Sequence, residues 1–179
     1  MRVLFPSRPD QTLSTRHWRW WLAVWAPALI AVLVICAEST ETLSAENTSG
    51  WLRPLFEHIF GRFQDANWDI LHHYIRKSGH FVGYGTVGLT FLRAWLYTLG
   101  GQAWASVRSW RVRSMLLAIA STAVIASCDE FHQTFLPGRT GTPVDVVLDT
   151  CGATTLCLLV WLMRFRSRSD VPPPVPADA

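Results

Sequence analysis

The feature that most constrains the fold is a run without any charged side chain, from Trp20 to Ala37. Its 18 residues would form a helix about 27 Å long, close to the thickness of the hydrocarbon core of a bilayer. Trp18, Trp20 and Trp21 at its start are typical of the interface between membrane and water. The run therefore predicts a retained membrane-spanning helix, since the apolar region of a cleaved signal peptide is usually shorter.

The composition of the whole chain points to the same class of protein. Half of the residues are hydrophobic, 16% are charged and ten are tryptophan, which is too apolar and too aromatic for an ordinary soluble domain of this size. The basic residues lie near the ends of apolar segments and not in runs, so we predict no nucleic-acid partner. The four cysteines lie in apolar segments without C-x-x-C spacing, so we expect buried thiols and no disulfide framework.

Three further apolar segments are too short to cross a membrane unless they include polar residues. The last two have only 15 and 14 residues between their flanking charges, whereas a spanning helix needs about 20. Extending each segment at one end supplies the length and brings carboxylates to membrane depth. The predicted fold is an all-α membrane protein in which four transmembrane helices form an antiparallel bundle. These helices cover about 20–37, 74–99, 113–132 and 143–163.

The remaining segments surround this four-helix domain, which we place at 20–165. Residues 1–19 form a basic N-terminal tail, and the proline-rich stretch 166–179 is predicted to be disordered. The polar stretch 38–73 is predicted to be an external loop. Within it, apolar residues recur at helical spacing over about 51–60, which predicts a short amphipathic helix that lies on the membrane surface or caps the bundle.

Arginine and lysine are distributed unevenly between the two predicted sides of the membrane. Ten lie on the side of the chain termini and five on the other side, and this bias places both termini in the cytoplasm. The ten are Arg2, Arg8, Arg16, Arg19, Arg108, Arg111, Arg113, Arg164, Arg166 and Arg168. The five are Arg53, Arg62, Arg76, Lys77 and Arg139.

Polar residues drawn into the predicted helices share faces. Lys77, His80 and Tyr84 recur on one face, Asp129 and Gln133 on another, and Asp145 and Asp149 on a third. Ionisable groups at membrane depth avoid lipid and face the bundle interior or a water-filled cavity. We therefore predict one polar site on the exterior side, with Arg139 reaching over it from the short turn. Gly79 and Gly83 form a small-xxx-small pair that would allow close helix packing. The predicted ligand-binding residues are Lys77, His80, Tyr84, Asp129, Glu130, Gln133, Arg139, Asp145 and Asp149.

The charges of this site do not balance. Two basic residues face four carboxyl groups, which leaves a net charge of about −2 that a half-buried site can carry only at high cost. We hypothesise that a carboxyl group is protonated, that a histidine is charged, or that a cation binds. His80, His132, Asp129, Glu130 and Asp145 are of metal-ligating types, but no H-E-x-x-H or similar spacing occurs. We therefore predict no metal site and no cofactor.

Together these motifs resemble the VanZ-like family of small bacterial membrane proteins. The resemblance covers about Asp69 to Met163 and rests on Lys-x-x-His-x-x-x-Tyr at 77–84, Asp-Glu-x-x-Gln at 129–133, Pro-Gly-Arg at 137–139 and the later Asp145. It implies a multi-pass protein of the bacterial cytoplasmic membrane. The founding member of the family is associated with teicoplanin resistance. Asp149 is a departure, because the family usually has asparagine there, and it adds a charge to this site.

The sequence is compatible with four functions. The first is binding of a cell-envelope lipid or glycopeptide-type ligand, with a possible effect on glycopeptide susceptibility. The second is acid–base catalysis on a lipid-linked envelope substrate, for which His80, Glu130 and Asp145 are the candidate catalytic residues. A proton-coupled transporter is the third, and it would need oligomerisation because four helices without a repeat are few. An ion-pair network that only fixes helix register is the fourth, though buried ion pairs are poor stabilisers.

Overall fold

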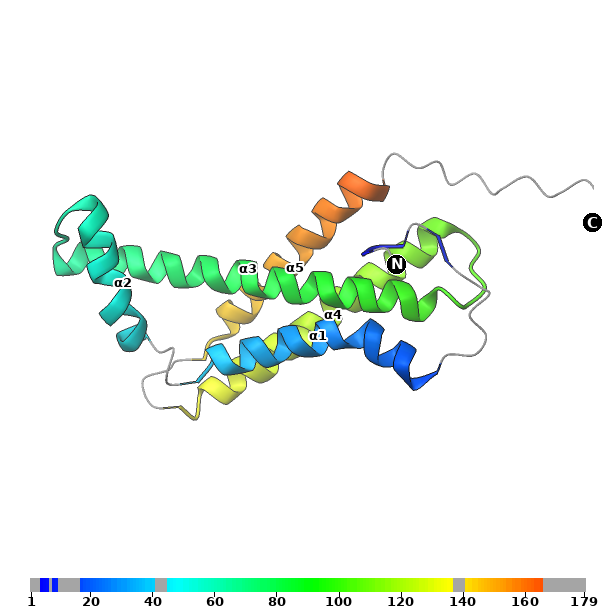
Figure 1. Cartoon of the computed structure of the whole chain (residues 1–179), viewed down its shortest axis with the longest axis horizontal. Helices are drawn as coiled ribbons and strands as arrows, with labels where there is room; N and C mark the ends of the chain where they lie inside the picture. The colour runs from blue at the N-terminus through cyan, green and yellow to red at the C-terminus, as the bar shows by residue number, and fades with distance from the viewer. Residues whose placement is uncertain (1–3, 7, 10–16, 41–44, 137–140, 166–179) are drawn as a thin grey trace, which may run out of the picture.

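The computed structural model describes residues 4–6, 8, 9, 17–40, 45–136 and 141–165, and over these ranges its secondary structure is entirely helical (Figure 1). The predicted all-α class is therefore confirmed. The helices are α1 (Trp18–Glu38), α2 (Ala45–Phe60), α3 (Asp65–Leu99), α4 (Val107–Gln133) and α5 (Pro143–Val160), and a π-helical turn (Trp161–Phe165) continues α5.

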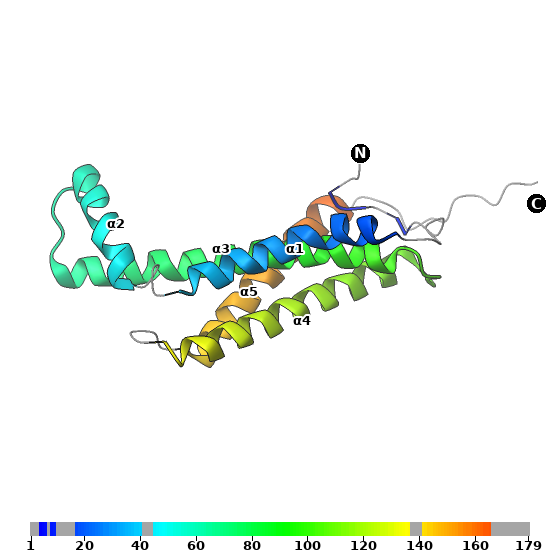
Figure 2. The ribbon, with the colours of Figure 1, turned by 60° about the horizontal axis from the view of Figure 1, so that its bottom comes forward.

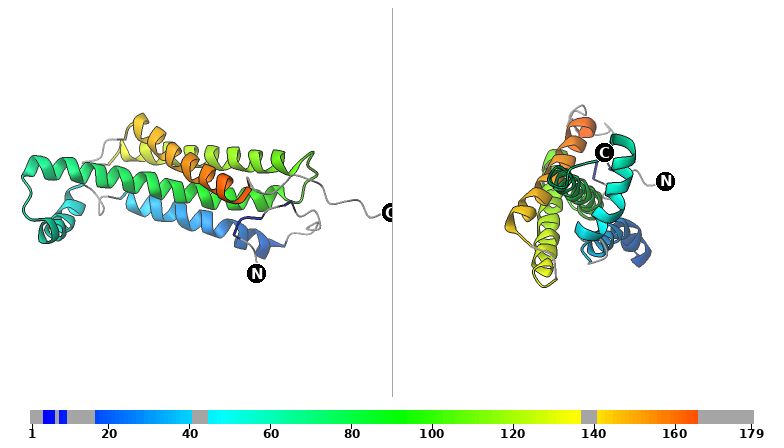
Figure 3. Two further views of the ribbon diagram at one scale, coloured as in Figure 1. Left: turned by 90° about the horizontal axis from the view of Figure 1, so that it is seen from above. Right: turned by 90° about the vertical axis from the view of Figure 1, so that its left-hand side faces the viewer.

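Helix α3 is the centre of the bundle and packs against α1, α4 and α5. Figure 3 shows α1 along one side of α3 and α4 with α5 along the other. The start of α1 and the end of α5 lie toward one end of the bundle, whereas α2 lies at the opposite end (Figure 1). Figure 2 shows α5 crossing obliquely between α3 and α4. Any polar residue on the inner face of α3 can therefore meet residues from several helices.

Within the described part of the chain, three helices are long and apolar enough to cross a membrane: α1, α4 and α5 extended to Arg164. Large apolar side chains on their outer faces are exposed, such as Leu29 and Val124. An apolar surface of this extent requires lipid or another apolar partner. The protein is therefore a membrane protein. Helix α3 does not belong to this group, because its apolar residues alternate with glycines, hydroxyls and charges.

The exposure of the cysteines reflects the same apolar outer faces of the helices. Cys36, Cys128 and Cys151 are exposed and only Cys157 is buried, and all four are free thiols. The prediction that all four would be buried is wrong for three of them. In a membrane bundle the outer face is apolar as well as the core, so a small apolar residue need not lie inside.

Helix α3 begins nine residues before the predicted 74 and continues beyond the bundle toward α2. Trp68 and His72, one helical turn apart, are buried there and stack with ring centroids 5.5 Å apart. Trp68 Nε1 donates a hydrogen bond to Ser49 Oγ of α2 at 2.6 Å. The polar stretch 38–73, which was predicted to be a loop, therefore contains a buried contact between α2 and α3. The connection between these two helices is short.

Helix α2 includes the amphipathic segment predicted over 51–60 and begins earlier, at Ala45. Its apolar side chains Trp51, Leu55 and Ile59 are exposed. Arg53 joins α2 to the start of α3, because it donates to Glu57 Oε1 at 3.0 Å and contacts Asp65 at 2.8 Å. The hydrogen bond from Arg53 lowers the pKa of the Glu57 carboxyl.

Helix α4 begins six residues before the predicted 113 because a capping box precedes it. Ser106 Oγ accepts from Ser109 N, and Ser109 Oγ accepts from Ser106 N. Such reciprocal bonds satisfy two amide groups that the helix itself leaves open. Arg108 and Arg111, which precede the predicted helix, therefore lie in the first turns of α4, and Arg111 is buried.

Helices α3 and α5 approach closely at glycines. A Cβ atom placed on Gly152 of α5 would lie 2.1 Å from the backbone oxygen of Phe81 in α3. One on Gly88 would lie 2.7 Å from the Cβ of Ala153. Gly79, which the sequence suggested for this contact, has nothing within 4 Å of such an atom, and Gly83 faces Ile35 of α1. On α3, the close approach to α5 is therefore made at Phe81 and Gly88 and not at Gly79.

We predict that Gly152→Ala lowers the free energy of unfolding by about 1–3 kcal/mol, because the added methyl group has no space against the α3 backbone. Thermal unfolding of the purified protein in detergent measures this change. Gly79→Ala is the matched control: it adds the same methyl group to open space in a helix, and we expect it to be neutral or stabilising. Equal melting temperatures for the two variants would contradict the close crossing.

Candidate functional site

The predicted polar residues that the structure describes meet where α3, α4 and α5 converge. Helix α3 contributes Lys77, His80 and Tyr84, and the final turns of α4 contribute Asp129, Glu130 and Gln133. Asp145 and Asp149 come from α5. We call this set the polar cluster. Arg139 lies outside the described residues, so its predicted role as a lid stays a prediction.

The outer level of the polar cluster is an ion pair between Lys77 Nζ and Asp145 Oδ1. Asp145 lies in the first turn of α5 because Thr142 is the N-cap and Pro143 follows it. Thr142 Oγ1 donates to Asp145 Oδ2 at 3.0 Å and accepts from Asp145 N at 3.3 Å. The cap therefore fixes the start of α5 and the orientation of the carboxylate that Lys77 contacts.

Lys77 is also the only lysine in the sequence. Its side chain retains 34% of its accessible surface, whereas that of Asp145 retains 13%. The lysine side chain is therefore the more accessible partner of the pair. Glu130 of α4 completes this level, because its Oε2 accepts from Thr142 N at 2.8 Å across the hairpin.

The inner level is a closed hydrogen-bond network around Asp129. Tyr84 Oη and Gln133 Nε2 each donate to Asp129 Oδ2 at 2.9 Å. Gln133 Nε2 also approaches Ser39 Oγ, at the end of α1, at 3.5 Å. All four residues are buried. This level links three helices and forms a floor whose polar groups already have partners.

The middle level of the polar cluster, between the outer and inner levels, consists of His80 and Asp149. The imidazole of His80 stacks on the ring of Tyr84 with centroids 6.2 Å apart. His80 Nδ1 lies 3.6 Å from Asp149 Oδ1, which is beyond hydrogen-bonding distance. Asp149 is fully buried. The middle level therefore differs from the inner one, because no described residue donates a hydrogen bond to its buried carboxylate.

Two residues of the site were not predicted. Ser39 follows the spanning segment α1 and carries no sequence signal that would link it to a glutamine 94 positions away. Thr142 had a readable signal, because a threonine directly before a proline is typical of a helix N-cap. Gly141, beside it, packs so closely on α4 that a Cβ atom would lie 1.9 Å from the backbone oxygen of Glu130. This packing holds the start of α5 against the end of α4.

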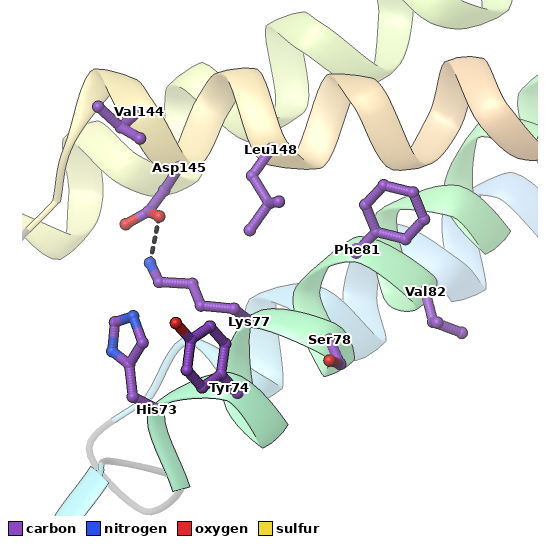
Figure 4. Close-up of a pocket in the computed structure, with 9 residues that line it drawn as sticks. All are labelled: His73, Tyr74, Lys77, Ser78, Phe81, Val82, Val144, Asp145 and Leu148. Carbon is purple, nitrogen blue, oxygen red and sulfur yellow. Dashed lines mark hydrogen bonds and ion pairs between the residues drawn. The ribbon is translucent and has the colours of Figure 1, made fainter. Parts of the chain in front are cut away.

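A groove between α3 and α5 opens beside the polar cluster (Figure 4). Its volume is about 650 Å³, and its walls are mostly apolar. Figure 4 shows Lys77 and Asp145 paired at one end of the groove, with Phe81, Val82 and Leu148 farther along it. Tyr74 and Val144 at its mouth are exposed. The groove thus offers one charged end and one apolar end.

A family model described as VanZ/LLP1 matches residues 21–164, a range that includes every residue of the polar cluster. No curated protein and no solved structure matches the chain.

Removing the phenolic hydroxyl from the floor should destabilise the protein. We predict that Tyr84→Phe costs about 1.5–3 kcal/mol, because a buried carboxylate loses a hydrogen-bond donor. Tyr74→Phe removes the same hydroxyl from an exposed side chain of the same helix and should change stability by less than about 0.5 kcal/mol. Chemical denaturation in detergent compares the two variants. A Tyr84→Phe protein as stable as Tyr74→Phe would show that the floor network contributes nothing.

Proposed function

This chain belongs to the VanZ/LLP1 family, and we propose that it is a membrane protein that binds a cell-envelope lipid between α3 and α5. The observation that carries the proposal is the two-part character of the groove, which has an ion pair at one end and an apolar wall at the other. Amphipathic lipids have the same two parts. A groove of about 650 Å³ is within the size range of small-molecule sites in proteins.

The apolar wall suits an acyl chain. Phe81 and Val82 of α3 and Leu148 of α5 line it, and Val82 is exposed toward the outer face of the bundle. An acyl chain could therefore enter sideways from the bilayer without crossing the helix core. A glycopeptide is a large polar molecule and gains little from this wall, so we favour a lipid ligand over a glycopeptide.

The charged end suits a headgroup that carries both a phosphate and hydrogen-bond donors. The Lys77 ammonium would bind the phosphate, and charge-assisted bonds of this kind are among the stronger hydrogen bonds. Asp145, the carboxylate that lines the groove, can accept hydrogen bonds from the hydroxyl or ammonium groups of the headgroup. A phosphate that draws Lys77 away from Asp145 would, in a ligand without donors, leave this carboxylate without its partner, which disfavours such a ligand.

We further propose that α3 is a fourth transmembrane helix. It is central in the bundle and contacts α1, α4 and α5, each of which is apolar enough to span. Its buried Tyr84 contacts α4 and its His80 faces α5, so these two polar groups lie inside the bundle. With four spans, both termini lie on one side, and the excess of arginine there supports the cytoplasm of a bacterium. The polar cluster and groove would then lie at the level of the outer leaflet.

A second candidate function is acid–base catalysis on a bound lipid. It is favoured by the position of His80, whose Nδ1 lies 3.6 Å from a buried carboxylate that could orient the ring. Recovery of the lipid after incubation separates the two functions. A binding protein returns the lipid unchanged, whereas an enzyme returns a product.

The lipid site predicts a headgroup preference that depends on Lys77. Phosphatidylethanolamine and phosphatidylglycerol should raise the melting temperature of the detergent-purified protein more than phosphatidylcholine, which has the phosphate but no donors. Lys77→Gln should weaken binding of the preferred lipids by about tenfold or more, because one charge-assisted bond is worth about 1.5–3 kcal/mol. The measured quantity is the lipid-induced shift, since the variant also leaves Asp145 unpaired.

Arg62→Gln is the control for this experiment, because Arg62 is an exposed basic residue outside the groove. It should leave the lipid-induced shifts as they are in the unmodified protein. Equal shifts with all three lipids, or an undiminished shift in Lys77→Gln, would overturn the proposed site.

The topology predicts the location of the two chain ends. Green fluorescent protein, which fluoresces only if it folds in the cytoplasm, should fluoresce when fused to either terminus. Alkaline phosphatase, which is active only outside the cytoplasm, should be inactive at both. Four spans place the ends on one side, whereas three spans place them on opposite sides, so one fluorescent and one phosphatase-active end would exclude α3 as a span.

A further inference from the structure

Asp149 is a buried carboxylate whose oxygens find no hydrogen-bond donor among the described residues. None of its surface is exposed, and neither Oδ1 nor Oδ2 accepts a hydrogen bond from any part of the chain that the structure describes. The inner carboxylate, Asp129, has two donors within 2.9 Å. A carboxylate that gives up water without gaining donors is strongly unfavourable unless a proton or a nearby positive charge neutralises it.

Two further metal-ligating groups face this carboxylate. One donor atom each from His80, Glu130 and Asp149 lies within 4.8 Å of the other two. Zinc bonds to nitrogen and oxygen are about 2.0–2.2 Å long, so two donors on one tetrahedral ion lie about 3.3–3.6 Å apart. His80 Nδ1 and Asp149 Oδ1 already lie 3.6 Å apart, and closure of the widest donor separation by roughly 1 Å would complete a three-ligand set. The three residues come from α3, α4 and α5, which the glycine contacts hold close together.

The charges around these residues also call for a cation. Among the described residues of the polar cluster, Lys77 is the only one with a permanent positive charge, and it faces Asp145. Glu130 and Asp149 are both buried, and neither is paired with a lysine or arginine in the part of the chain that the structure describes. A divalent ion between them would neutralise both carboxylates, while a neutral imidazole nitrogen from His80 would complete the donor set.

We propose that His80, Glu130 and Asp149 bind one divalent transition-metal ion of the zinc or manganese class. One imidazole and two carboxylates are donors that both ions accept. Thr142 N orients Glu130 by donating to its Oε2, and stacking on Tyr84 orients the His80 ring, so two ligands have supporting contacts. The sequence did not predict this site, because ligands from three separate helices have no linear spacing. The site does not depend on the proposed lipid.

The test is the metal content of the purified protein. The full chain is purified in detergent through a tag without histidine, stripped with a chelator, and equilibrated with Zn²⁺ or with Mn²⁺ alone. We expect about one ion per chain of at least one of these metals by elemental mass spectrometry, and a higher melting temperature with that metal. Glu130→Gln and His80→Gln should each lower its affinity by about tenfold or more, because each removes one of three ligands.

Asp149→Asn keeps the test decisive if the other variants fold poorly. It removes the uncompensated charge, so the metal-free variant should be at least as stable as the metal-free parent, yet it should lose the metal-dependent shift. His132→Gln and Asp69→Asn are matched controls that remove an exposed imidazole and an exposed carboxylate, and both should retain the metal. Absence of both metals from the parent protein, or full retention in the three ligand variants, would overturn the proposal.

Discussion

The close crossing of α3 and α5 is the contact on which the rest of the structure depends. Gly152 of α5 has no side chain at the point where the backbone of Phe81 in α3 passes it. Gly88 of α3 likewise has no side chain at the point where it meets Ala153 of α5. This spacing brings the preceding turns of both helices together, so that Lys77 meets Asp145 and His80 faces Asp149. Larger residues at the crossing would separate the two polar faces, and the groove and the polar cluster would lose their shape.

The levels of the polar cluster differ in how well their charges are satisfied, and this difference separates structure from function. At the floor, Asp129 has donors from Tyr84 and Gln133, which is a sufficient account of why a carboxylate is tolerated there. Asp149, one level outward, has no hydrogen-bond donor among the described residues. A purely structural ion-pair network would not leave its most buried carboxylate unsatisfied. The proposed functions therefore concern the middle and outer levels, and the floor supports them.

Simple physical limits allowed much of this arrangement to be predicted. Two apolar segments were too short to span without Asp129 and Asp145, and helical phase then placed their acids on the face that meets Lys77, His80 and Tyr84. The extension of α3 to Asp65 was missed because Trp68 and His72 are buried by α2, which no local pattern reveals. The crossing glycines were misassigned because four glycines in α3 share similar spacing and only the partner helix distinguishes them. Ser39 and the three-helix donor set depend on tertiary contacts alone.

The most direct test of a lipid site uses the fact that Lys77 is the only lysine in the chain. Reductive methylation with ¹³C-formaldehyde labels this side chain and the N-terminal amine, and it preserves the positive charge of both. On titration with phosphatidylethanolamine in detergent, the Lys77 methyl signal should shift and saturate, while the N-terminal signal should stay constant and phosphatidylcholine should have a smaller effect. A Lys77 signal that does not move, or that moves equally with both lipids, would contradict headgroup binding between α3 and α5.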